Sequence, residues 1–207
     1  MTTRPSQDWT PLDWTCDPIP GDPGDVRITG MLMSRTADAA EGAAGHLRRL
    51  VAGDGQCSDA ISKILVRAGE AASDLDRVKV RYSGAATALM EYGVVLSDAQ
   101  AASIRALRAA EPASDLRRQA NEDLSTVQMQ AENSIDPQER QVLITQLYQL
   151  KATRDDARSS LESAKQALRQ AIEDRDKAAF RAKAEIDTAV RTSELNDSGW
   201  DKAKHVL

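Results

Sequence analysis

Apolar side chains recur every three or four residues over most of the chain, which is the spacing of one face of an α-helix. We expect the first such stretch to form a helix over 22–52. Asp22 suits its N-cap and Pro23 its first position. A Gly-Asp-Gly turn signal begins at Gly53, so the helix should end there. Its apolar positions are Val26, Leu32 or Met33, Ala37, Ala40, Ala44, Leu47, and Leu50 or Val51.

The next stretch, 57–135, carries the most regular pattern in the chain. Two rows of apolar or small residues repeat every seven positions, like the a and d positions of a coiled coil. We call them together the heptad seam: Ile61, Ala68, Leu75, Tyr82, Leu89 and Leu96, with Ile64, Ala71, Val78, Ala85, Tyr92 and Ala99. The pattern predicts a long helix whose seam is covered by other helices, of this chain or of a partner. Pro112 should kink or break this helix, because proline lacks an amide hydrogen and its ring clashes with the preceding turn.

A third helix is predicted over 136–192. Asp136, Pro137 and Glu139 form an N-terminal signal of the capping-box type. This helix is longer than the part of the second helix that follows Pro112, so it should run back alongside Tyr82–Leu107. Its apolar face is Leu143, Leu147, Leu150, Ala157, Leu161, Ala164, Leu168, Ile172, Ala179, Ala182, Ile186 and Ala189.

The segments outside 22–195 have a different pattern. Four prolines interrupt residues 1–21, which excludes a regular helix and indicates an extended arm anchored by Trp9, Leu12 and Trp14; a disordered tail is the alternative. Residues 196–207 follow a break at Asn196–Gly199 and are expected to form a short helix or a linker to a further domain. The predicted fold class is all-α: elongated antiparallel hairpins in a coiled-coil bundle over 22–195, with three long helices and a short C-terminal one.

Composition narrows the range of functions. Only 3% of the residues are aromatic and 29% are charged, which is typical of long helices packed through small side chains. The net charge of −5 argues against binding to nucleic acid and to anionic lipid. No stretch approaches the length of a membrane span, and the first residues lack the apolar core of a Sec signal peptide.

The residues that carry chemistry are few. The two histidines, His46 and His205, have no zinc-ligand spacing with the cysteines, and no Gly-rich loop has a phosphate-binding pattern. We therefore predict no catalytic site, no metal and no cofactor. Cys16 and Cys57 are expected to be free thiols, with a bridge between them as the alternative.

The N-terminal half resembles the helical secretion-signal domain that opens many actinobacterial polymorphic toxins exported by type VII systems, a group related to the WxG- and LxG-type helical hairpins. The resemblance is carried by Asp8-Trp9-Thr10-Pro11-Leu12, by Asp17-Pro18-x-Pro20-Gly21-Asp22-Pro23, and by a series in the second helix: Leu75, Tyr82, Ala85, Ala86, Leu89, Tyr92, Leu96 and Ala99-Gln100. Ser198-Gly199-Trp200-Asp201-Lys202 is similar to the segment that follows the helices in that family. Val51-Ala52-Gly53 stands where the small hairpins have Trp-x-Gly.

The resemblance implies a non-enzymatic targeting domain that binds small helical WxG-like partners and type VII machinery. Such a domain would be cytoplasmic before export, then secreted or attached to the cell surface by a non-Sec route, with a toxin domain beyond it. The residues expected to bind the partner are Trp9, Leu12, Trp14, Val51, Gly53, Leu75, Tyr82, Leu89, Tyr92 and Leu96. The alternative function is a structural coiled coil or self-assembling spacer with no export role.

Overall fold

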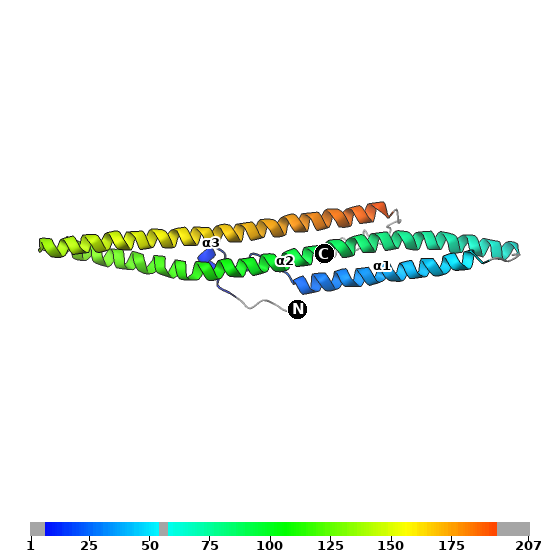
Figure 1. The fold of residues 1–207 in the computed structure, drawn as a ribbon, viewed down its shortest axis with the longest axis horizontal. Coiled ribbons are helices and arrows are strands. Elements are labelled where there is room, and N and C mark those ends of the chain that lie inside the picture. Colours follow the sequence, from blue (N-terminus) through cyan, green and yellow to red (C-terminus); the bar gives the residue numbers. More distant parts are fainter. Residues whose placement is uncertain (1–6, 54–57, 194–207) are drawn as a thin grey trace. The chain divides into compact units, whose positions relative to one another are not determined.

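A computed structural model of the chain describes residues 7–53 and 58–193 (Figure 1). A 3-10 turn, η1 (Thr10–Leu12), precedes three α-helices: α1 (Pro23–Val51), α2 (Asp59–Asn133) and α3 (Pro137–Thr192). The described residues contain no strand, so this part of the chain is all-α, with the helices packed against one another as the apolar spacing predicts. The expected short helix within 196–207 lies outside the described residues.

Side chains at the helix ends satisfy backbone groups that a helix leaves unpaired. The Asp22 carboxylate accepts from the amide nitrogens of Gly24 at 2.8 Å and Asp25 at 3.2 Å, and it thereby caps α1. At the turn between α2 and α3, the Ser134 hydroxyl donates to Oε2 of Glu139 at 2.8 Å. Arg140 donates to the Ser134 carbonyl oxygen at 2.6 Å, so the turn between the two helices is held by side chains.

Helix α2 continues through Pro112 without interruption, so the helix does not break there. Proline removes the hydrogen bond to the carbonyl group four residues earlier, which belongs to Arg108. Both Arg108 and Pro112 are exposed, and water can therefore satisfy that carbonyl group. The adjacent Ala113 and Ala110 are buried, which means that packing holds the helix together on its other face.

The contacts divide the chain into two compact units. Among the described residues, unit 1 contains 22–53, 58–95 and 176–193, and unit 2 contains 7–21 and 96–175. Helices α2 and α3 therefore contribute to both units, whereas α1 belongs to unit 1 and the N-terminal arm to unit 2.

In unit 1, α2 has a helix on two of its sides. On one side lies α1: Lys79 bonds Glu41 at 2.5 Å, and Arg48 pairs with Asp76. A Cβ added at Gly30 would lie 2.8 Å from Cγ of Met90, so α1 and α2 approach closely there. On another side lies the end of α3, where a Cβ added at Gly84 would lie 2.7 Å from Cβ of Ala189.

The members of the heptad seam differ in how far neighbouring helices bury them. From Leu75 to Ala99 its members are buried or half-buried. Near the start of α2, however, Ile61, Ile64 and Ala71 are exposed. Ala68 is half-buried and the nearby Ala72 is 2% exposed, so packing by the described chain begins at about Ala68, and Ile61 and Ile64 precede it.

Candidate helix-binding surface

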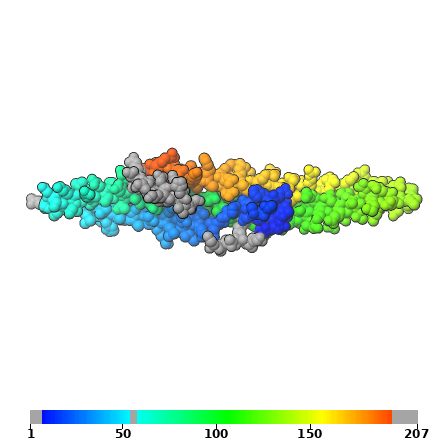
Figure 2. Space-filling model, turned by 180° about the vertical axis from the view of Figure 1, so that it is seen from behind, coloured from blue at the N-terminus to red at the C-terminus, as the bar shows by residue number. Residues whose placement is uncertain are grey.

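The N-terminal arm folds into the core of unit 2. The side chains of Trp9 and Leu12 are 4% and 2% exposed. They form one cluster with residues of α2 and α3, namely Ala106, Leu107, Ala110, Ala113, Leu161, Ala164 and Leu168. Figure 2 shows the blue arm lying against the green part of α2. The alanines leave room that the two large arm side chains fill.

Local hydrogen bonds give the arm its bend. The Asp8 carboxylate accepts from the Thr10 amide at 2.9 Å and from the Thr10 hydroxyl, and these bonds lower the pKa of Asp8 below its ordinary value. The carbonyl oxygen of Trp9 accepts from the amides of Leu12 at 2.9 Å and Trp14 at 3.2 Å. The resulting turn directs Trp9 and Leu12 to the same cluster.

Gln100 of α2 ties the second half of the arm to the core of unit 2. Its side-chain Nε2 donates to the carbonyl oxygen of Ile19 at 3.1 Å and to that of Gly21 at 2.9 Å. Both Gln100 and Ile19 are buried. Lys165 adds an ion pair with Asp13 at 2.6 Å. Between residues 9 and 21 the arm is therefore packed into unit 2.

Replacing Gln100 with methionine should loosen the arm. The substitution keeps the shape of the side chain but leaves the carbonyl oxygens of Ile19 and Gly21 without their donor, at a cost of about 1–3 kcal/mol. We expect faster proteolysis of residues 9–21 and a lower urea midpoint. Gln170→Met is the control, because Gln170 is exposed and bonds only within its own helix. Equal proteolysis rates in the two variants would contradict this account.

The residues that were predicted to bind a partner fall into three groups, which are buried, exposed and half-buried in the structure. Trp9, Leu12 and Leu96 are buried within the chain, so they support its own core in this conformation. Trp14, Val51 and Gly53 are exposed. The remaining predicted residues are half-buried in the heptad seam of unit 1: Leu75, Tyr82, Leu89 and Tyr92.

A group of exposed aliphatic side chains lies at one end of unit 1. We call it the end cluster, and its members with their exposed fractions are Leu50 65%, Val51 40%, Ile61 46%, Ile64 66% and Val66 62%. They come from the last turn of α1 and the first turns of α2. Sequence analysis singled out Val51 but placed Ile61 and Ile64 in a covered seam, and it did not consider Val66. Val66 stands two positions after Ile64 and therefore points to the opposite side of α2, so the side that a partner could cover is the one with Ile61 and Ile64.

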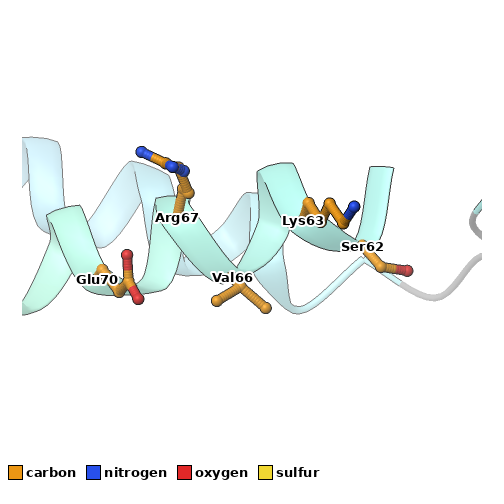
Figure 3. A pocket seen from close by; sticks show the side chains of 5 residues that line it. All are labelled: Ser62, Lys63, Val66, Arg67 and Glu70. Atoms are coloured by element: carbon orange, nitrogen blue, oxygen red, sulfur yellow. The ribbon is translucent and has the colours of Figure 1, made fainter. Parts of the chain in front are cut away.

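A shallow hollow of about 470 Å³ lies on α2 within this end of unit 1. Ser62, Lys63, Val66, Arg67 and Glu70 line it, all from consecutive turns of the one helix (Figure 3). Their side chains point in several directions and do not converge on one point. Such a surface suits contact with another helix better than the enclosure of a small molecule.

Two of the residues considered for chemistry, His46 and Cys16, lie within the described residues. Nδ1 of His46 lies 2.8 Å from the carbonyl oxygen of Gly42, in its own helix. Cys16 is free and exposed, whereas Cys57 and His205 lie outside the described residues. Within 7–53 and 58–193, no three His, Cys, Asp or Glu side chains are grouped to hold a metal ion. No helix in that part of the chain is both long and apolar enough to span a bilayer.

Arg81 is a buried polar residue of unit 1 that sequence analysis did not notice. Its side chain is 4% exposed, and it holds the end of α3. Nε donates to the Ser193 hydroxyl at 2.9 Å, and Nη2 donates to the Val190 carbonyl oxygen at 3.3 Å. A guanidinium group suits the last carbonyl groups of a helix, which carry partial negative charge. The signal in the sequence was an arginine directly beside a seam position.

We predict that Arg81→Met frees the last turns of α3. The methionine keeps an apolar stem but removes charged hydrogen bonds, each worth about 1.5–3 kcal/mol. Hydrogen exchange over residues 186–193 should accelerate by about 10- to 100-fold, while α1 stays protected. Arg191→Met is a suitable control, since Arg191 is exposed and bonds the Asp187 carbonyl oxygen of its own helix. Unchanged exchange in Arg81→Met would refute the role given to Arg81.

No protein-family model, curated protein or solved structure matches this chain.

Proposed function

We propose that the chain is a non-catalytic secretion-signal or adaptor domain of a protein exported by a type VII system, and that it binds small helical partner proteins. The proposal joins the resemblance of residues 8–23 and 75–100 to one structural observation. That observation is the end cluster, in which Leu50, Ile61, Ile64 and Val66 are about half exposed or more. A partner that covers them would remove this apolar surface from water.

The burial of the arm supports the same proposal. Residues 8–23 carry the resemblance, and Trp9, Leu12 and Ile19 within them pack into unit 2. The segment is thus part of the folded domain, as a targeting domain recognised in its folded state would require. On this proposal the chain is cytoplasmic before export and then secreted or held at the cell surface, and an activity such as a toxin resides in another domain.

The proposal also includes the way in which the helices pair. We infer antiparallel helical hairpins of the coiled-coil type, in which α1 returns along the first half of α2. In support, the partners of α1 residues run in opposite order on α2: Arg48 pairs with Asp76, Glu41 with Lys79, and Gly30 faces Met90. Such hairpins accept a further helix along an exposed seam.

The test is co-expression of the full chain with each small helical protein encoded beside its gene, followed by affinity purification. We expect at least one neighbour to copurify in a fixed ratio. Secretion from a host with a type VII system should then require both the neighbour and the type VII motor. The proposal would be abandoned if no neighbour bound the chain and if the chain also reached the medium without a type VII system.

The second candidate function is a self-assembling structural coiled coil, which the regular heptad seam favours. Sedimentation equilibrium separates the two. A homodimer that persists at micromolar concentration, and that neighbouring proteins do not alter, would favour the structural role. A monomer that forms a complex only with a neighbour would favour the adaptor.

A further inference from the structure

The two units differ in the size of the side chains that fill their cores. In unit 2 large apolar side chains are buried, among them Ile19, Leu161 and Leu168. In the described part of unit 1, every buried hydrophobic residue is an alanine: Ala37, Ala40, Ala44, Ala72, Ala85, Ala86, Ala88, Ala182 and Ala189. Unit 2 receives Trp9, Leu12 and Ile19 from the N-terminal arm, whereas the described part of unit 1 consists of segments of the three long helices and contains no such arm.

The larger apolar side chains of the heptad seam in unit 1 are only half-buried. These are Leu75, Val78, Tyr82, Leu89 and Tyr92 on α2. Helix α1 lies on one side of α2 and the end of α3 on another, yet together they bury only the alanines fully. A further segment that packed on these five residues would remove their remaining apolar surface from water.

Arg81 holds the end of α3 next to this part of the seam. Its Nε donates to the Ser193 hydroxyl at 2.9 Å, and its Nη2 donates to the Val190 carbonyl oxygen at 3.3 Å. Arg81 lies one turn from the seam members Val78 and Ala85, because residues three or four apart are neighbours on a helix surface. The chain therefore reaches Ser193 beside the seam, and residues 194–207 continue from that point.

We infer that residues 194–207, which lie outside the described residues, bind to the heptad seam of unit 1, and that the indole of Trp200 packs against Val78 and Tyr82. The inference goes beyond the proposed function, because it concerns a contact within the chain that does not depend on export. It also assigns Leu75 and Tyr82 to the chain's own fold and leaves the end cluster as the surface for a partner.

The length of the segment allows this contact. Trp200 follows Ser193 by seven positions, and an extended chain of that length spans up to about 23 Å. Along α2, Leu75 lies six positions before Arg81 and Leu89 lies eight positions after it, which correspond to about 9 and 12 Å of helix. Trp200 can therefore reach the seam anywhere between these two leucines.

The composition of the segment and its attachment to α3 favour it over a separate protein. The chain has three tryptophans, and Trp200 is the one outside the arm. In unit 2 the arm sets a precedent, since Trp9 and Leu12 cover alanines of α2 and α3 there. A segment tethered by a few residues has a local concentration on the order of millimolar. A separate partner would also lose its translational and rotational freedom on binding.

The first measurement is the accessibility of Trp200 in the full chain. Subtracting the emission of Trp200→Phe from that of the unchanged chain isolates Trp200 from Trp9 and Trp14. We expect emission at shorter wavelength than that of N-acetyl-tryptophanamide, and acrylamide quenching several-fold weaker, because a packed indole is shielded from water. Emission and quenching equal to those of the free compound would overturn the inference.

Two valines of α2 provide matched variants that locate the contact. Val78 is a half-buried member of the seam, whereas Val80 is 50% exposed and points to a different side of the helix. Val78→Glu should increase the quenching of Trp200 several-fold, because it places a carboxylate in the contact. Val80→Glu should leave the quenching unchanged. Each is compared with the same variant carrying Trp200→Phe, and equal quenching in the two variants would contradict the inference.

A double-mutant cycle separates loss of this contact from general destabilisation of unit 1. Trp200→Ala should lower the melting temperature, and combining it with Val78→Glu should cost less than the sum of the two single losses, because both remove the same contact. With Val80→Glu the losses should add. A Trp200→Ala variant that melts like the unchanged chain, or additive losses in both pairs, would refute the contact.

Dilution tests whether the segment binds its own chain or a second copy. A contact within one chain does not depend on protein concentration, so the quenching of Trp200 should stay constant from micromolar to nanomolar concentration. Protection of Trp200 that disappears on dilution would assign the seam to residues 194–207 of a second copy and would overturn the inference as stated.

Discussion

Trp9→Ala is expected to lower the free energy of unfolding by about 3–5 kcal/mol, the largest effect of any single truncation we predict for unit 2. The indole is 4% exposed and packs in one cluster with Leu12, Leu161 and Leu168. Its removal leaves a cavity whose walls include Ala106 and Ala110, and alanines have no side chain long enough to fill it. Urea denaturation followed by circular dichroism measures the loss.

Trp14→Ala provides the matched control. It removes the same indole from the same arm, but Trp14 is 39% exposed and does not belong to the buried cluster. We expect a loss of no more than about 1 kcal/mol, in line with substitutions at the surface. If the two variants lost similar stability, the arm would not be anchored through Trp9, and its docking in unit 2 would have to be abandoned.

Leucine at two glycines of α1 should have effects of opposite sign. A Cβ at Gly30 would lie 2.8 Å from Cγ of Met90 and 3.1 Å from the carbonyl oxygen of Ala86, so a larger side chain forces α1 away from α2. Overpacking of this kind costs about 3 kcal/mol. At Gly42 nothing lies within 4 Å of the added Cβ. Gly42→Leu should therefore gain up to about 1 kcal/mol from helix propensity.

Thermal unfolding of the two leucine variants measures both effects. We expect Gly30→Leu to melt several degrees lower than the unchanged chain and Gly42→Leu to melt at the same temperature or slightly higher. The comparison controls for helix propensity, since both positions lie inside α1 and receive the same residue. Destabilisation at Gly42 as large as at Gly30 would mean that α1 packs through a different face.

The helices themselves were predictable because their signals are local. Asp22-Pro23 and Asp136-Pro137 mark the starts of α1 and α3, and Gly53 follows the end of α1. At Pro112 the sequence predicted a kink or a break, and α2 does not break there. The outcome there depends on whether the freed carbonyl group of Arg108 meets water, and only the packing of α2 decides which of its faces is exposed.

The surface that we propose for binding was predicted only in part. Val51 was chosen from its place in the turn between two helices, and it is exposed. Trp9 and Leu12 were chosen as aromatic and aliphatic anchors in a proline-rich arm, and they pack into the chain's own core. Sequence patterns identify which residues need to be covered, but they do not distinguish cover by the same chain from cover by a partner.

The sequence by itself determined that the described chain is helical, where the helices begin, and which face of α3 is apolar. These properties depend on the spacing and capping of residues within a few turns. The tertiary structure decided that α2 is shared by two units, that Arg81 and Gln100 are buried donors, and that the heptad seam is exposed at Ile61 and Ile64. Those outcomes depend on where α1 and α3 end relative to α2, which is a relation between residues far apart in the chain, and no local pattern encodes it.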